Sequence, residues 1–353
     1  MNMGPIKTAL LSFGMSGRVF HAPFLHLNPG FELYAIWERD KNLSKTLYPY
    51  VRIYRSFEEI LQDDAIELVV VNTPNYTHYE YTKAVLKAGK HAVVEKPFTV
   101  TVEEGLELES LAIEVGKKLA VFQSRRYDSD SRTVKKIVEE GWLGEIVEVE
   151  LHYDRYTTAL SPKVHKETPG PGRGLLYDLG SHLLDQVLQL WGMPSAVYAD
   201  IGIIRPISKV DDYMELLLFY PAQRNLRVRL KSSYLVREPV PATALYGTLG
   251  TFLKPKADPQ EQRLLAGAMP DEKGWGVEPD SGKGFLHTEK DGKVIREHIP
   301  SMKGDYGDFY VGMFDAIRNN KPVPVTPEEG IDIIRVITAA YKSNELKKVI
   351  PVE

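Results

Sequence analysis

The sequence predicts an α/β protein with a doubly wound parallel sheet first and an α+β domain with a large, mostly antiparallel open sheet after it. Three observations predict this fold. Short apolar runs alternate with helical segments over the first third of the chain, a glycine-containing turn follows the first run, and later runs succeed one another without helical segments between them. A length of 353 residues exceeds the usual single core, so we expect two domains, residues 1–124 and 125–353.

The apolar runs of the first domain have the length and composition of strands. They are Ile6–Phe13, Phe31–Trp37, Val51–Tyr54, Ile66–Asn72, His91–Val94 and Leu119–Gln123. Ile66–Val71 is apolar almost without a break, which is typical of a central strand buried on both faces. Between the strands, Ser56 with Glu59 predicts a capped helix start, and the helical periodicity of Thr77–Ala88 stops at Gly89.

The pattern changes after Gln123. Gly141 to Gly144 separates a helical segment from Ile146–Tyr153, where apolar and polar residues alternate with period two. Consecutive strands of an antiparallel sheet are expected at Ala196–Ile204, Tyr213–Tyr220, Leu226–Tyr234 and Ala242–Leu253. Residues 254–284 are rich in proline, glycine and charge and too long for an ordinary connection; a lid, an interface arm and a passive insertion all remain open.

The composition excludes several classes of function. A net charge of −4, with acids and bases interspersed, offers no basic surface for nucleic acid or an anionic membrane. No apolar stretch reaches the length of a membrane span, and the first residues lack the cleavage pattern of a signal peptide. The absence of cysteine excludes disulfides and thiolate sites, and no other residues have metal-ligand spacing. We therefore expect a cytoplasmic protein that acts on a small molecule without a metal.

The turn after the first strand has the form of a phosphate-binding fingerprint. Ser12, Gly14 and Gly17 take the three glycine places of G-x-G-x-x-G, with Met15 and Ser16 between them. In a Rossmann domain such a turn lets the backbone approach a pyrophosphate at the start of a helix. A glycine turn without a ligand is the alternative interpretation.

An acidic residue followed by a basic one ends the second strand. A carboxylate at this place, Glu38, accepts hydrogen bonds from the adenosine ribose and favours NAD over NADP. Arg39, directly after it, could instead bind the 2′-phosphate of NADP. The sequence therefore leaves both cofactors open, and a solvated charged turn remains a further interpretation.

Polar residues also follow the fourth and fifth strands, at the edge where open α/β sheets bind ligands. After the fourth strand, Thr73, Pro74, Asn75 and His78 could line the nicotinamide ribose, although His78 could instead cover a helix start.

After the fifth strand come Glu95, Lys96 and Pro97. A lysine delivered to this strand end can reach a bound cofactor, and the following proline restricts the backbone that carries it. A turn with a surface lysine is the alternative.

The second domain offers a carboxylate and an imidazole four residues apart. Asp178 and His182 lie in Leu176–Leu190, which reads as one helix ended by Gly192. This spacing places both side chains on one helix face, where the carboxylate can orient the imidazole for general-base chemistry. A packing ion pair is the alternative.

Three more polar residues are candidates for binding a hydroxylated substrate: Arg126 and Tyr127 after the sixth strand, and Arg155 at the end of the first strand of the second domain. Salt bridges between the domains would explain them equally well.

Ordered at these separations, the motifs resemble those of the Gfo/Idh/MocA family, named for glucose-fructose oxidoreductase and inositol dehydrogenase. The resemblance covers essentially the whole chain. It rests on the glycine turn, Thr73-Pro74-Asn75 with His78, Glu95-Lys96-Pro97, and Asp178-x-x-x-His182 after a glycine-rich loop. Finer features look like the subgroup that contains scyllo-inositol dehydrogenases: Gly17-Arg18-Val19-Phe20-His21-Ala22-Pro23, Arg125-Arg126-Tyr127-Asp128, Asp258-Pro259-Gln260-Glu261 and Gly274-Trp275-Gly276.

The resemblance implies an NAD(P)-dependent dehydrogenase that transfers hydride between nicotinamide and a secondary alcohol of a cyclic polyol or sugar. Lys96 would hydrogen-bond the reacting hydroxyl, His182 would exchange its proton, and Asp178 would orient the histidine or the substrate. Glu95 and Lys96 would also contact the cofactor, and the Lys96–Pro97 bond would be cis.

The resemblance also implies an open sheet that joins copies of the chain into a homodimer or homotetramer. Subgroup members often use NADP, which opposes the preference expected from Glu38. A cofactor-retaining glycosidase or epimerase and a non-catalytic NAD(P)-dependent sugar sensor remain alternative functions.

Overall fold

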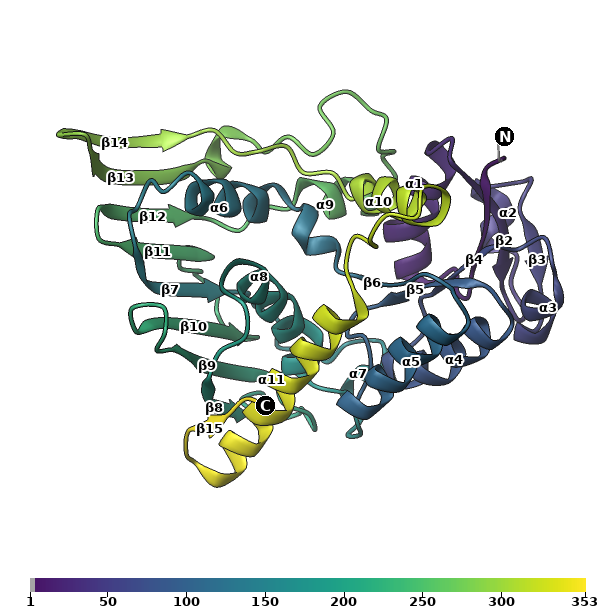
Figure 1. Ribbon diagram of the computed structural model, residues 1–353, viewed down its shortest axis with the longest axis horizontal. Coiled ribbons are helices and arrows are strands. Elements are labelled where there is room, and N and C mark those ends of the chain that lie inside the picture. The colour runs from purple at the N-terminus through teal and green to yellow at the C-terminus, as the bar shows by residue number, and fades with distance from the viewer. Residues whose placement is uncertain (1–3) are drawn as a thin grey trace. The chain divides into compact units, whose positions relative to one another are not determined.

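The computed structural model describes residues 4–353 and divides them into two compact units. The first unit extends to Ser124 and also contains Gln260–Trp275 and Asp305–Ile331. The second consists of Arg125–Pro259, Gly276–Gly304 and Asp332–Glu353. The chain therefore passes several times from one unit to the other (Figure 1, coloured by residue number).

The first unit is built on a six-stranded parallel sheet with the order β3-β2-β1-β4-β5-β6. Its strands are β1 Ile6–Leu10, β2 Phe31–Trp37, β3 Arg52–Tyr54, β4 Leu68–Val71, β5 His91–Glu95 and β6 Leu119–Phe122. The predicted doubly wound sheet is confirmed. The direction of winding reverses between β1 and β4, and open α/β sheets bind ligands at such a switch point, outside the carboxyl ends of the strands.

Helices connect these strands. They are α1 Ala22–Leu27, α2 Leu43–Leu47, α3 Phe57–Gln62, α4 His78–Lys87 and α5 Val102–Glu114, with α9 Pro259–Leu265 and α10 Gly307–Arg318 added from later in the chain. Right-handed crossovers place the helices of the two windings on opposite faces of the sheet. The predicted capping box is present, with Ser56 accepting from the Glu59 amide and the Glu59 carboxylate from the Ser56 amide.

The second unit contains a nine-stranded sheet with the order β14-β13-β12-β11-β7-β10-β9-β8-β15. The strands are β7 Ile146–His152, β8 Ala196–Gly202, β9 Tyr213–Tyr220, β10 Leu226–Ser233, β11 Thr243–Gly247, β12 Gly250–Lys254, β13 Gly284–Lys290, β14 Lys293–Ile299 and β15 Ile350–Pro351. Only the β7–β10 pair is parallel among the named strands, so the sheet is mostly antiparallel, as predicted.

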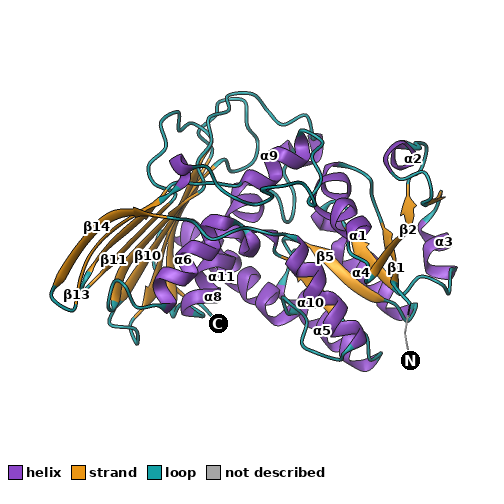
Figure 2. Ribbon diagram, turned by 90° about the horizontal axis from the view of Figure 1, so that it is seen from above, coloured by secondary structure: helices purple, strands orange, loops and turns teal. Residues whose placement is uncertain are grey.

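Helices α6 Ser129–Glu139, α8 Ser181–Trp191 and α11 Pro327–Leu346 cover one face of this sheet (Figure 2). The second unit also contains the short helix α7 Val164–Glu167. Strand β9 illustrates the two faces, because Met214, Leu216 and Leu218 are fully buried while the residues between them keep some exposure. Within residues 4–353, no helix combines the length and apolar character needed to span a bilayer.

Two predicted elements were wrong in detail. Ala242–Leu253, expected as one strand, is the hairpin of β11 and β12, with Thr248 and Leu249 as its loop. The hairpin forms where Gly247 approaches the backbone of Leu143 so closely that a Cβ would collide with its carbonyl oxygen. The expected helix Leu176–Leu190 begins as a π-helical turn, Leu176–Gly180, before α8.

The long segment 254–284 is packed and contains helix α9. Gln260 accepts a hydrogen bond from the Tyr306 amide (2.8 Å), and Trp275 is buried against Phe24, with ring centroids 6.3 Å apart. Both contacts lie within the first unit. This part of the segment thus belongs to the core around α1, which no pattern in the sequence predicted.

Candidate active site

The glycine turn has the backbone geometry that its motif requires. The Ser12 hydroxyl accepts from the Gly14 amide (3.1 Å), and the Asn72 side chain donates to the Ser12 carbonyl (2.8 Å). A Cβ on Gly17 would collide with that carbonyl, so only glycine fits there. Gly14 is exposed, and Met15 and Ser16 are partly exposed. The backbone packing therefore leaves no room for a side chain at Gly17, the third glycine place. Gly14, at the second place, is exposed where a pyrophosphate would approach.

The carboxylate of Glu38 is engaged by the start of α2. It is 7% exposed and accepts hydrogen bonds from the amides of Leu43 (2.9 Å) and Ser44 (3.1 Å) and from the Ser44 hydroxyl (2.5 Å). Arg39, by contrast, is exposed. Glu38, the predicted ribose acceptor, thus already accepts hydrogen bonds from within the protein. The exposed charge at this strand end is that of Arg39.

His78 is buried and joins two loops at the carboxyl edge of the sheet. Its Nδ1 lies 2.9 Å from the Pro97 carbonyl oxygen and its Nε2 lies 3.0 Å from that of Thr73. Burial lowers the pKa of the imidazole, although the neighbouring carbonyls act in the opposite direction. In this arrangement His78 holds the Thr73–Asn75 loop against the Lys96–Pro97 loop.

The Glu95 side chain lies at the centre of a hydrogen-bonded network beside Lys96. One carboxylate oxygen accepts from the Ser16 hydroxyl of the glycine turn and lies 3.0 Å from His21 Nε2, while the other accepts from the Lys96 amide (3.2 Å). His21 Nδ1 in turn lies 2.6 Å from the Tyr310 hydroxyl. The Lys96–Pro97 bond is cis, which confirms the expectation from the resemblance.

Sequence reasoning did not assign a role to His21 or Tyr310. His21 lies on a π-helical turn, Gly17–His21, directly after the glycine turn, and such turns are frequent at functional sites. The one sequence feature that could have indicated a role for His21 was its position in the Gly17–Pro23 motif. Tyr310 lies 289 residues further along the chain, so no local pattern could have linked the two residues.

Two buried side-chain oxygens at the carboxyl edge of the first unit have no hydrogen-bond partner among the described residues. They are Asn72 Oδ1, after β4, and Gln123 Oε1, after β6. Buried acceptors are almost always paired in native proteins, so these oxygens favour a ligand with amide or hydroxyl donors. Together with the open glycine turn, the residues present fit a dinucleotide cofactor.

In the second unit, polar side chains gather where β7 and β10 end side by side. Asp178 accepts from Lys166 Nζ (2.6 Å), and the ring of His182, 6% exposed, stacks on Tyr153 with centroids 6.3 Å apart. The guanidinium of Arg155 lies 5.3 Å from the centroid of the same tyrosine ring. The structure thus brings together the predicted Asp178, His182 and Arg155, and it adds Lys166, which sequence reasoning missed.

Arg126 forms a buried two-pronged ion pair with Asp185. Its Nε and Nη2 both donate to that carboxylate, the latter at 2.7 Å, and the two side chains are 9% and 1% exposed. Asp185 lies three residues after His182 on α8, so the pair fixes the helix that carries the imidazole. This geometry favours a positioning role for Arg126 over direct substrate contact. Tyr127 lies beside it, with its ring under the guanidinium of Arg132.

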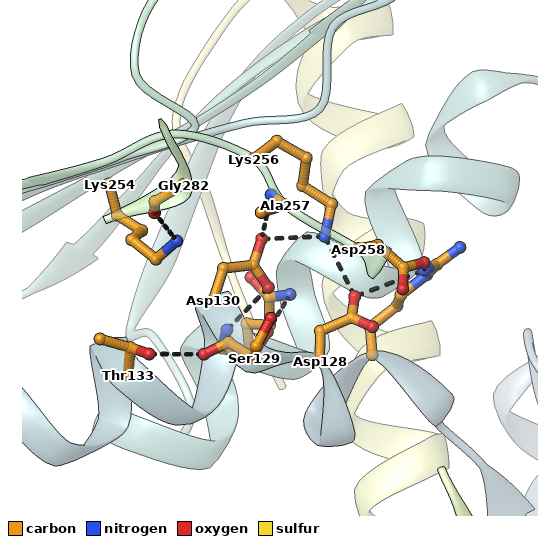
Figure 3. Close-up of polar contacts among 12 residues, drawn as sticks. Asp128, Ser129, Asp130, Thr133, Lys254, Lys256, Ala257, Asp258 and Gly282 are labelled. Carbon is orange, nitrogen blue, oxygen red and sulfur yellow. Dashed lines mark hydrogen bonds and ion pairs between the residues drawn. The ribbon is translucent and has the colours of Figure 1, made fainter. Parts of the chain in front are cut away.

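Two of the subgroup motifs meet in a cluster of charges (Figure 3). Arg125 pairs with Asp258 and Asp128, and Lys256 Nζ lies 3.0 Å from both Asp128 and Asp130. Burial raises the pKa of Asp128 to about 7, against the lowering effect of Lys256 and Arg125. These ion pairs lie within the second unit, so they attach the segment around Asp258 to the start of α6. Among the side chains that the structure describes, no group of His, Asp or Glu has an arrangement that could hold a metal ion.

The Lys254–Glu278 ion pair beside this cluster allows a test of stability. Lys254 Nζ lies 2.6 Å from Glu278, the two side chains are 0% and 2% exposed, and the ammonium also donates to the Gly282 carbonyl. Replacing Lys254 with Met leaves a buried carboxylate without its cation, so we expect the free energy of unfolding to fall by about 3–5 kcal/mol in denaturant titrations.

The double variant Lys254→Met/Glu278→Gln should recover part of this loss, because it removes the unpaired charge. Lys135→Met serves as the control, since its pair with Glu139 is exposed and worth about 0.5 kcal/mol. Equal stability of Lys254→Met and the control would contradict the assignment of a buried pair.

Comparison with known proteins identifies the family. Residues 6–123 match the NAD-binding Rossmann fold of the Gfo/Idh/MocA oxidoreductase family, and residues 135–353 match its C-terminal alpha/beta domain. The chain belongs to the Gfo/Idh/MocA family. As a member it is an NAD(P)-binding oxidoreductase, which confirms the resemblance inferred from the motifs.

Members of the Gfo/Idh/MocA family resemble this chain over its full length. The scyllo-inositol 2-dehydrogenase (NADP(+)) IolW of Bacillus subtilis is 38% identical, over 99% of this chain and 96% of the relative. The crystal structure of an oxidoreductase from Bacteroides fragilis has a TM-score of 0.91 at 46% identity, covering 98% of this chain and 99% of that one. That of the oxidoreductase YvaA from Bacillus subtilis has a TM-score of 0.94 at 38% identity and covers 100% of both chains.

Proposed function

We propose that the protein is an NAD(P)-dependent dehydrogenase that oxidises a secondary alcohol of a cyclic polyol or sugar, with scyllo-inositol as the first candidate. The observation that carries the proposal is the hydrogen bond from Ser16 to Glu95, because it places the glycine turn next to Lys96. A lysine at a strand end beside a phosphate-binding turn can hold a substrate hydroxyl against the cofactor. The similarity to a scyllo-inositol dehydrogenase supports the substrate class.

Each proposed catalytic residue has a separate task. The nicotinamide, when bound, accepts or supplies the hydride. The Lys96 ammonium donates a hydrogen bond to the reacting oxygen and stabilises the negative charge that develops on it. His182 accepts the hydroxyl proton, and Asp178 orients the imidazole or a second hydroxyl. Thr73, Pro74 and Asn75 would line the nicotinamide ribose at the carboxyl end of β4, and Arg155 and Tyr127 would contact the substrate.

We infer that NADP is the preferred cofactor. At the end of β2 a free carboxylate would favour NAD, but Glu38 already accepts three hydrogen bonds, two of them from amides at the start of α2. The partial positive charge of a helix start offsets part of the negative charge that would repel a 2′-phosphate. The exposed guanidinium of Arg39 can then bind that phosphate. IolW, a relative over the full chain, is named as an NADP enzyme.

Titration with both oxidised cofactors tests this preference before any substrate is known. We expect NADP to bind at least about tenfold more tightly than NAD, because a charge-assisted contact to phosphate contributes on the order of 1.5–3 kcal/mol. Arg39→Ala should remove most of the difference by weakening NADP alone. Arg52→Ala is the matched control, since Arg52 lies at the amino end of β3. Tighter binding of NAD would instead indicate that the Glu38 carboxylate accepts hydrogen bonds from the adenosine ribose.

A panel of inositols, hexoses and their keto forms with the better cofactor then tests the reaction. Net formation of reduced nicotinamide with a cyclic polyol is the expected result. Conversion of a glycoside or epimer without net reduction would replace the dehydrogenase with a cofactor-retaining glycosidase or epimerase. Binding of cofactor without turnover of any member of the panel would favour a sensor.

A further inference from the structure

The network around Glu95 joins four segments of the first unit at one carboxylate. Ser16 comes from the glycine turn, His21 from the π-helical turn after it, Lys96 from the loop after β5, and Tyr310 from α10. His21 and Tyr310 are both 0% exposed. The Glu95 side chain is 13% exposed, and a largely buried carboxylate is costly unless donors surround it, so the network keeps this one charged.

The direction of the hydrogen bonds follows from the groups involved. Burial, with a contribution from the charge of Glu95, raises the pKa of the Tyr310 hydroxyl well above its ordinary value, so that it keeps its proton and donates to His21 Nδ1. With Nδ1 accepting from Tyr310, the proton on His21 Nε2 is donated to Glu95. Ser16 donates to the same oxygen. The chain of donors runs from Tyr310 through His21 and ends at the carboxylate.

The donors explain why the carboxylate stays ionised. Burial raises the pKa of Glu95, but the hydrogen bonds from His21 and the Ser16 hydroxyl and the charge of Lys96 outweigh it and lower the pKa to about 2. His78, on α4, is a further titratable group that the charge of Glu95 influences, in the direction of a higher pKa, although burial lowers the pKa of the imidazole overall. Throughout the neutral range, a fixed negative charge therefore lies at the carboxyl end of β5, next to the turn that receives the cofactor.

This charge distinguishes the two redox forms of a nicotinamide cofactor. The second winding of a doubly wound sheet, β4 to β6 here, receives the nicotinamide half of a dinucleotide. The oxidised ring is a cation and the reduced ring is neutral, so a carboxylate in a poorly hydrated site attracts the first more than the second. The same charge offsets the ammonium of Lys96, which would otherwise repel the oxidised ring.

We propose that His21 and Tyr310 are positioning residues that act through Glu95, and that their network makes the site favour oxidised over reduced cofactor. The inference rests on the proposed function, since it concerns the same cofactor site. According to this proposal, the network sets the ratio of the dissociation constants for oxidised and reduced cofactor. A role in folding alone would not change that ratio.

The test measures dissociation constants for the oxidised and reduced forms of the preferred cofactor by calorimetry, without a substrate. Glu95→Gln keeps the shape and removes the charge, and His21→Phe removes the donor. Each should weaken binding of the oxidised form about tenfold and change the reduced form by less than about threefold, as expected for the loss of a charge-assisted contact. Tyr310→Phe should act in the same direction with a smaller effect, because it touches the carboxylate only through His21.

A double variant separates action through Glu95 from independent packing. If His21 acts through the carboxylate, His21→Phe/Glu95→Gln will have the same ratio as Glu95→Gln alone. His91→Gln, at the amino end of the same strand, is the matched control and should leave both constants unchanged. Equal weakening of both redox forms by Glu95→Gln and His21→Phe would refute the proposal and leave the dehydrogenase function standing. Failure of the unaltered protein to bind either form would overturn both.

Discussion

Replacement of Lys96 with Met is expected to lower turnover on the order of 10³-fold while cofactor affinity stays within about threefold. Methionine has nearly the length of the lysine stem but no charge, so the pyrophosphate turn and the Glu95 network remain in place. What is lost is the group that donates to the reacting oxygen and stabilises its charge. The rate should be measured with the best substrate of the panel, at saturating cofactor, beside a cofactor titration of the same variant.

Lys83→Met is the control for this experiment. Lys83 lies on α4 and pairs with Glu107 at the surface, so its removal should leave turnover unchanged. A Lys96→Met variant with full activity would show that another group holds the substrate. A variant that loses cofactor binding in parallel with turnover would assign Lys96 to the cofactor alone.

Replacement of His182 with Asn should reduce turnover by about 10²- to 10⁴-fold, the range of a general acid or base. Asparagine retains hydrogen-bonding groups but does not accept a proton near neutral pH. The expected signature is therefore a loss of the pH dependence that the imidazole imposes on the rate, together with the lower rate. The measurement is the dependence of kcat/KM on pH for both proteins.

His287→Asn provides the comparison, because His287 is exposed on β13 and has no place in the proposed chemistry. An unchanged pH profile in His182→Asn would remove the imidazole from proton transfer. The buried Arg126–Asp185 pair holds the same helix, so a thermal unfolding curve of His182→Asn should match that of the unaltered protein.

Local patterns predicted the parallel sheet, its helix starts and the loops at its carboxyl edge. Strand β2 has the predicted limits Phe31–Trp37, and the capping box at Ser56 formed as expected, because each depends on residues within a few positions of one another. The hairpin in Ala242–Leu253 was missed although two glycines flank its loop. Apolar residues on both sides of the glycines hid the turn, which the close approach of Gly247 to Leu143 requires.

Periodicity and motif spacing act over short distances, so they predicted the doubly wound sheet, the glycine turn and the candidate residues Lys96, Asp178 and His182. The contacts that support these residues became visible only in the folded protein. Glu38 accepts hydrogen bonds at a helix start, Arg126 pairs with Asp185, and His21 connects Glu95 to Tyr310. Burial and ion pairing join groups from distant segments. Such contacts exist only once the chain has folded, and they decide which charges remain available to a ligand.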